Sequence, residues 1–229
     1  MERLATYQRK MGKLPDSIVI FRDGVAEVSS SAVSSENRTY VHHPLKQNQY
    51  DMVLNAELPR IKAAFKAFRD YRPKVTLAIC AKRHHTRAFV QNPTDGDRTG
   101  NTPAGTVIDQ GITSVFDFDF YLQPHACLQG TVRSTHYTVL HDENKFGADE
   151  IQGGTNALSY MWARATKGVS LVPPAYWADT ACERGRCYLR EVISAPDSRR
   201  LTEDQVWEKS RQLWGEGVHD SLKHTMYYL

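Results

Sequence analysis

Basic side chains crowd one stretch of the sequence, between Leu58 and Val90. Nine basic residues face a single acid there, Asp70. The nine are Arg60, Lys62, Lys66, Arg69, Arg72, Lys74, Lys82, Arg83 and Arg87. Clustered positive charge neutralises phosphates and releases their counterions, so an excess of this size indicates a polyanion partner. From Arg60 to Lys74 we favour a solvated helix face, whereas Lys82 to Arg87 follow a predicted strand and favour the polyanion.

Other residue types with chemical potential are ambiguous when read from spacing alone. Asp23 opens an Asp-Gly pair after a short apolar run, which is more often a turn than a site. Asp179 reads as an exposed helix acid. The neighbouring His84 and His85 suggest a metal, but adjacent side chains point apart on a strand or a helix. The four cysteines contain no CxxC pair, so zinc binding of the usual spacing is not favoured.

The composition is that of an ordinary folded domain. The chain has 229 residues, 41% hydrophobic and 24% charged, with a formal net charge of +3. This length allows one or two domains. No apolar run reaches the ~18 residues of a membrane helix, and the charged start lacks the apolar block of a signal peptide. We therefore expect a reducing, intracellular setting: the cytoplasm, with the nucleus as the alternative.

The periodicity of apolar residues predicts the elements that position these side chains. Strands are expected at 17–21, 75–80, 115–122 and 135–141. Helices are expected at 54–68, with Pro59 near the first turn, at 149–165, and over about ten residues from Ala175. The charged tail, 201–219, is expected to be mobile. This alternation predicts an α/β domain with a mixed sheet.

Six stretches, taken in order, resemble the C-terminal part of the PIWI domain of a eukaryotic Argonaute protein, with a fungal-type protein as one option. They are IVIFRDGVAE, AKRHHTRAF, NTPAGTVID, FDFYLQPHACLQGTVRSTHYTVLHDEN, VSLVPPAYWAD and HTMYYL. The resemblance implies an RNase H-like α/β fold, a mixed sheet flanked by helices, here lacking the first strands of the complete fold. It also implies that residues 1–229 are a partial PIWI domain of a longer protein that carries MID and PAZ domains.

The resemblance implies a slicing site built on carboxylates. RNase H-type sites hold two Mg²⁺ or Mn²⁺ ions with acidic side chains and cut a phosphodiester. Asp23 matches the family's third catalytic and metal-binding position, the Asp of RDG, and Asp179 matches the last one, which is His or Asp. The first Asp and the Glu of the family are not found in this sequence. We therefore expect the parent to be an endoribonuclease and the chain alone to be inactive.

The resemblance also implies contacts to a small guide RNA. The residues that match family positions near guide phosphates are Lys82, Arg87, His125, Arg133, Arg164, Ser170, Tyr176 and Arg184. Without the resemblance, these residues would be interpreted as surface or helix-capping residues. Trp162 and Lys167 replace a common tyrosine and a common arginine. Such contacts address phosphate and sugar, so base pairing with the guide must supply the specificity for a target RNA.

These expectations lead to three hypotheses. The first is a guide-RNA-binding PIWI segment that acts in RNA interference and gene silencing and carries part of a slicer site. The second is a non-catalytic guide-binding protein of the same family, and the third is an RNase H-like DNA-processing enzyme.

Tryptophan-containing protein partners are a further expectation from the family. Residues 28–48 read as a surface-loop insertion or as a translated, unspliced intron.

Overall fold

The computed structural model describes residues 2–24, 49–194, 201–214 and 217–229. The chain forms two compact units, Met1–Pro173 and Pro174–Leu229, and each is described by itself. The inserted segment 28–48 lies outside the described residues, so both interpretations of it stay predictions.

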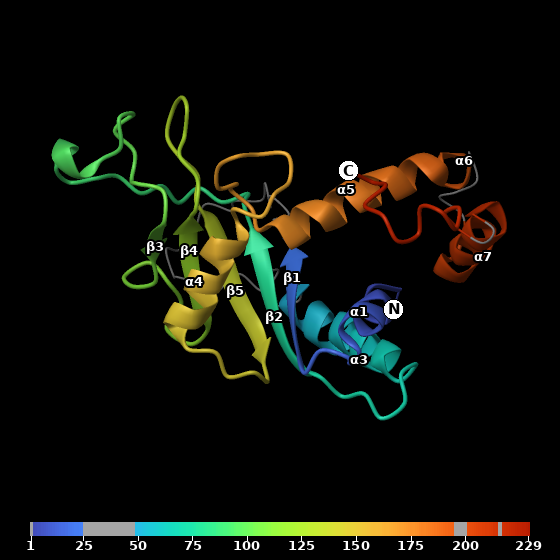
Figure 1. Ribbon diagram of the computed structural model, residues 1–229. Coiled ribbons are helices and arrows are strands. Elements are labelled where there is room, and N and C mark those ends of the chain that lie inside the picture. Colours follow the sequence, from blue (N-terminus) through green and yellow to red (C-terminus); the bar gives the residue numbers. More distant parts are fainter. Residues whose placement is uncertain (1, 25–48, 195–200, 215–216) are drawn as a thin grey trace, which may run out of the picture. The chain divides into compact units, whose positions relative to one another are not determined.

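The first unit is built on a mixed five-stranded sheet (Figure 1). Its strands are β1 (Ser17–Asp23), β2 (Lys74–Ala81), β3 (Thr106–Ile108), β4 (Phe118–Gln123) and β5 (Thr135–Asp142). Their order across the sheet is β1-β2-β5-β4-β3. β1 and β2 are parallel, and the remaining pairs are antiparallel. The predicted α/β class and mixed sheet are confirmed.

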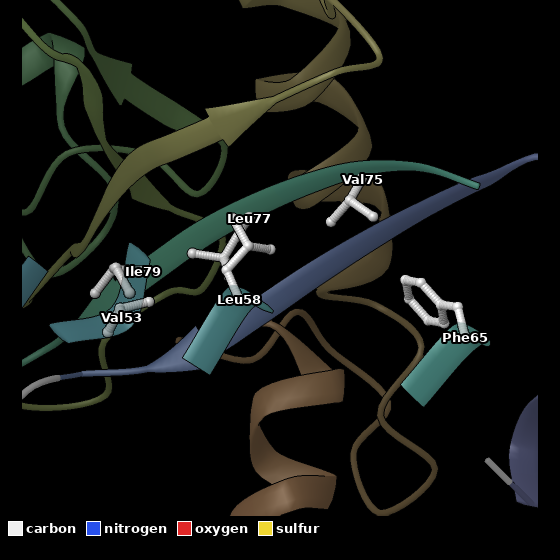
Figure 2. Close-up of a cluster of buried hydrophobic side chains, with 6 residues drawn as sticks. All are labelled: Val53, Leu58, Phe65, Val75, Leu77 and Ile79. Carbon is white, nitrogen blue, oxygen red and sulfur yellow. The ribbon is translucent and has the colours of Figure 1, made fainter. Parts of the chain in front are cut away.

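Helices flank this sheet. They are α1 (Glu2–Met11), the π-helical segment η1 (Val53–Glu57), α3 (Leu58–Phe65) and α4 (Ala148–Leu158), with a short 3-10 turn, η2 (Pro93–Asp95), in a loop. β2 is buried over Val75–Cys80, as a central strand with both faces covered must be. Figure 2 shows its apolar side chains facing those of η1 and α3.

The helix predicted from Leu54 to Phe68 is present but not uniform. Val53–Glu57 is wound as a π-helix, in which the Leu58 N–H donates to the Val53 carbonyl. α3 then begins, with Pro59 in its first turn. Proline has no N–H and its ring crowds the carbonyl four residues back, so the wider π turn relieves the conflict.

Two predicted boundaries in the first unit are wrong. The strand expected from Val115 begins only at Phe118, because Ser114 accepts hydrogen bonds from the next backbone N–H groups and holds a turn. The helix expected to reach Ala165 ends at Leu158. There Ser159 is buried, and its carbonyl accepts from the Val169 N–H at 3.0 Å, which fixes the chain outside the helix.

The second unit is helical: α5 (Pro173–Tyr188), α6 (Arg190–Ile193) and α7 (Glu203–Trp214). α5 is longer than the ten residues predicted. The tail expected to be mobile contains α7. The rings of Tyr188 and Trp214 pack edge to face, 5.3 Å apart, so α7 has an apolar anchor on α5.

Candidate nucleic-acid interface

The end of β2 delivers Lys82 to a polar cluster whose members are far apart in the sequence. The Lys82 ammonium donates a hydrogen bond to the hydroxyl of Ser170, 88 residues away. The hydroxyl of Thr135, in β5, donates to the carbonyl of Ser170 at 2.5 Å. Thr135 and Ser170 are buried, and Lys82 is half-buried. The cluster therefore fixes one positive charge at the end of β2, an interior strand of the sheet.

A histidine lies within electrostatic reach of this ammonium. Burial, and after it the charge of Lys82, lowers the pKa of His125 to about 4, so its ring is neutral at pH 7. The buried His125 Nδ1 has no hydrogen-bond partner within the described part of the chain. Such an atom costs free energy unless a ligand or water satisfies it. His125 thus offers a polar ring atom near a fixed cation.

The loops that carry His125 and Ser170 meet backbone to backbone. A Cβ placed on Gly168 would lie 2.3 Å from the carbonyl oxygen of Pro124. Only glycine permits this approach, because the obstacle is main chain and not a side chain that could rotate away. Pro124 precedes His125, and Gly168 lies two residues before Ser170. The contact therefore fixes the two predicted RNA-binding residues relative to each other.

The turn after β2 is stabilised from within. Arg87 Nη1 donates to the carbonyls of His84, at 3.1 Å, and Thr86, at 2.7 Å. His84 is buried, and its Nε2 contacts the Ser134 carbonyl at 2.9 Å. Burial lowers the pKa of His84, which makes it a neutral structural residue. His85 is exposed, so the adjacent histidines point to different environments, as predicted.

The other arginines predicted for the first unit are exposed. The charge of Arg133 contributes to the lowered pKa of His84, so Arg133 lies near the same turn. Arg164 stands in the turn region after α4. Of the predicted residues in this unit, Lys82, His125 and Ser170 converge. Arg87 and Arg133 lie near His84 instead.

Asp23 ends β1 in a braced position. Its Oδ1 accepts from the Gly24 N–H at 2.8 Å, and its carbonyl accepts from Arg22 Nη1 at 2.6 Å. The same guanidinium forms a two-pronged ion pair with Glu57, at 2.9 and 3.2 Å. A Cβ on Gly24 would lie 3.0 Å from the carbonyl of Cys80, which explains the glycine after Asp23.

A metal centre of the kind the sequence predicts needs several acidic side chains close together. Asp23 is exposed at the strand end, which suits a ligand. Among the described residues, however, no three Asp, Glu, His or Cys side chains gather closely enough to hold an ion. Those residues alone therefore do not form a two-metal site, and no reaction step through Mg²⁺ or Mn²⁺ is derived.

The remaining predicted residues belong to α5 in the second unit. Tyr176 and Asp179 are three residues apart and so share a helix face. Tyr176 is half-buried, whereas Asp179 and Arg184 are exposed. Both charged side chains are therefore accessible to a polar ligand.

The fold and this interface define an RNase H-like domain of the Piwi type. The sequence profile of the Piwi domain matches residues 45–190, more than half of the chain. The chain belongs to the Piwi domain family. It is 38% identical over 244 residues to Protein argonaute 1C of Oryza sativa subsp. japonica, covering 99% of this chain and 22% of that protein.

Solved Argonaute structures share the fold. The C-terminal lobe of a budding yeast Argonaute superposes with a TM-score of 0.77 at 31% identity, covering 99% of this chain and 42% of that one. Kluyveromyces polysporus Argonaute with a guide RNA gives 0.76 at 31% identity, covering 99% and 25%. The chain spans about a fifth of the length of the curated relatives it matches. No helix in its described segments is long and apolar enough to cross a membrane.

Proposed function

We propose that this chain binds a small guide RNA through phosphate contacts, as part of an Argonaute that acts in RNA-mediated gene silencing. The observation that carries the proposal is the convergence of Lys82, Ser170 and His125, brought together from three distant segments. A fixed ammonium beside hydroxyl and imidazole groups is a set of phosphate ligands. The guide RNA in the Kluyveromyces polysporus structure supports the same class of ligand.

Cleavage would need the carboxylates as well as the RNA-binding cluster. Asp23 and Asp179 are two of the four metal ligands expected of a slicer, and we propose that they serve an endoribonuclease site with Mg²⁺ or Mn²⁺ in the parent. RNA binding needs neither residue. The non-catalytic guide-binding protein is therefore the second candidate.

Tryptophan-bearing protein partners stay a prediction, but one cavity offers a suitable lining. It measures about 610 Å³, and its aromatic wall comes from α3 and the segment that follows it. The apolar lining residues are Phe65, Phe68, Tyr71 and Pro73. Aromatic walls of this kind suit an indole ring because aromatic pairs stack or meet edge to face.

The first test removes charge without removing hydrogen-bond donors. Lys82→Gln with Arg133→Gln should weaken binding to short single-stranded RNAs equally for all sequences, because phosphate contacts do not read bases. Two phosphate contacts are lost, so the slope of log K against log salt should fall by about 1.4, which is about 0.7 per contact for a single strand. Fluorescence anisotropy across a salt series measures both quantities.

A matched control loses the same charge elsewhere. Lys10→Gln with Arg69→Gln alters two exposed residues outside the cluster and should leave affinity nearly unchanged. If both double variants lowered RNA affinity equally, binding would depend on overall positive charge and not on the Lys82 cluster. A loss that depends on base sequence, or tighter binding of duplex DNA than of RNA, would contradict the guide-binding proposal and favour the DNA-processing alternative.

The half-buried His125 predicts a pH dependence of stability. The pKa of His125 is lowered from 6.5 to about 4 in the folded chain. Between these values the unfolded chain binds more protons at this residue, so stability falls as pH drops through the window. The loss at pH 5 should be on the order of 1 kcal/mol, since the ring is only partly buried. Urea unfolding at pH 7 and pH 5 measures this loss of stability. In the His125→Asn chain, the part of the loss that comes from His125 should disappear.

A further inference from the structure

One loop of the first unit exposes apolar side chains that the RNA-binding cluster does not use. The loop 109–118 leads from the edge strand β3 into β4. Val115 is 90% exposed and Phe116 is 88% exposed, with Ile112 at 51%. Apolar groups gathered at one place on a surface mark interaction sites more often than scattered ones do.

The exposure is held in place by hydrogen bonds within the loop. The hydroxyl of Ser114 accepts from the N–H groups of Phe116, at 3.3 Å, and Asp117, at 3.2 Å. The Ser114 N–H donates to the buried carboxylate of Asp119 at 2.7 Å. With the polar groups of the turn paired inside it, Val115 and Phe116 lie outermost. A turn that is already ordered loses little entropy when it binds.

The far end of the loop is tied to α4. The side-chain amide of Gln152, which is buried, donates to Asp109 Oδ2 at 3.1 Å. The Thr113 hydroxyl donates to the carbonyl of Asp109 at 3.0 Å. The loop is thus anchored at both ends to the folded unit.

The charged residues of the loop and of the chain on either side of it are all acidic. From Thr99 to Val132 the sequence holds three aspartates and no lysine or arginine. Asp109 and Asp117 are exposed beside the apolar residues. An exposed aromatic ring could stack on a nucleic-acid base, but such binding needs a positively charged track for the phosphates. The acids repel a phosphate backbone, so charge complementarity selects a basic partner.

We propose that the loop 109–118 docks a segment of a protein partner that is rich in apolar side chains and in Lys or Arg. The apolar side chains of the partner pack on Phe116 and Val115, and its Lys or Arg residues face Asp109 and Asp117. Aromatic side chains at the centre of an interface, surrounded by polar contacts, carry most of the binding energy in known complexes. This surface differs from the Lys82 cluster in both charge and residues, so it extends the function from RNA binding to protein assembly.

The test selects partners by chemistry. A random peptide library is selected on the full chain, with counter-selection on Phe116→Ser, and the enriched peptides are measured by fluorescence anisotropy. Peptides rich in Lys or Arg and apolar residues should emerge and should bind the Phe116→Ser chain at least tenfold more weakly. Asp117→Asn should weaken them about threefold, and the weakening should vanish at high salt, where the charges are screened.

The controls separate this surface from others. Leu128 is also highly exposed, at 82%, and lies outside the loop, so Leu128→Ser should not change peptide affinity. The Phe116→Ser chain should have the same melting temperature as the unsubstituted chain, because the Phe116 ring is exposed and does not pack in the core. Acidic peptides, no enrichment, or equal binding to Phe116→Ser would overturn the proposal. So would loss of RNA affinity in Phe116→Ser, or self-association of the chain that this substitution abolishes.

Discussion

Replacing His136 by Ala should destabilise the first unit by about 3–5 kcal/mol. His136 Nε2 donates to Asp119 Oδ2 at 2.5 Å, and the Asp119 side chain is only 5% exposed. Removing the imidazole leaves a buried carboxylate without its partner, which costs more than the pair itself contributes. The melting temperature should fall by about 10 °C for a chain of this size. Differential scanning calorimetry measures the change.

Two companion variants isolate the cause. Asp119→Asn combined with His136→Ala removes the charge while an amide oxygen can still accept from Ser114, so it should be more stable than His136→Ala alone. His141→Ala changes a histidine on the same strand that contacts Glu143 at a partly exposed site. That substitution should cost less than about 1 kcal/mol. If His141→Ala were as damaging as His136→Ala, the buried pair would not be the reason.

Gly168→Ala should damage both stability and RNA binding. Its Cβ would lie 2.3 Å from the Pro124 carbonyl oxygen, so two main-chain segments must separate. Overpacking of this kind costs about 1–3 kcal/mol. The movement also shifts Ser170 away from Lys82 or His125, so RNA affinity should fall roughly tenfold, in line with the loss of about one charge-assisted hydrogen bond. Calorimetry and RNA anisotropy on one preparation report the two effects.

The control for this prediction is another glycine. Gly153 lies in α4, and a Cβ there meets nothing within 4 Å. Gly153→Ala should leave RNA affinity unchanged and raise stability by about 0.5–1 kcal/mol, since alanine restricts the unfolded chain. Unchanged RNA binding by a folded Gly168→Ala chain would show that the contact of the two loops does not position the cluster.

The elements that periodicity predicted correctly are those whose own side chains face a core. The strand expected at 75–80 is Lys74–Ala81, and the strand expected at 17–21 is Ser17–Asp23. β2 is an apolar run that is buried over Val75–Cys80. We also expected the run at 17–21 to be buried, and that part was wrong: β1 lies at the edge of the sheet, its residues are at most half-buried, and Val19 is exposed. The strand expected from Val115 failed because its alternation of apolar and acidic residues continues into a turn that Ser114 holds. Periodicity records which residues could face a core, and a local side-chain bond can override it.

One missed helix did have a signal in the sequence. α7 begins with a reciprocal pair of bonds: Thr202 accepts from the Gln205 N–H, and Gln205 accepts from the Thr202 N–H. This is the capping-box spacing of threonine and glutamine three residues apart. The charged composition of the tail suggested mobility, but the cap marked the start of a helix.

The residues that form the candidate site were named from the sequence, but the residues that support them were missed. Lys82, His125 and Ser170 came from the family resemblance. Glu57, which braces Arg22 next to Asp23, and Thr135, which holds Ser170, carry no local signal. Each acts through a partner far away in the sequence, so only the folded chain reveals it. Gly168 is similar, because a glycine in a loop says nothing about what lies against it.

The order of pairing in the sheet has a consequence for how the chain folds. β3, β4 and β5 form an antiparallel meander joined by the segments 109–117 and 124–134, whereas β1 pairs with β2 in parallel across the much longer stretch 24–73. Contacts between distant segments form late because loop closure must come first. The meander, which already contains Thr135, should therefore form early. The bond from Lys82 to Ser170 closes across 88 residues and belongs to the late events. During refolding, RNA binding should therefore appear later than secondary structure. Only chains that have finished folding should bind RNA.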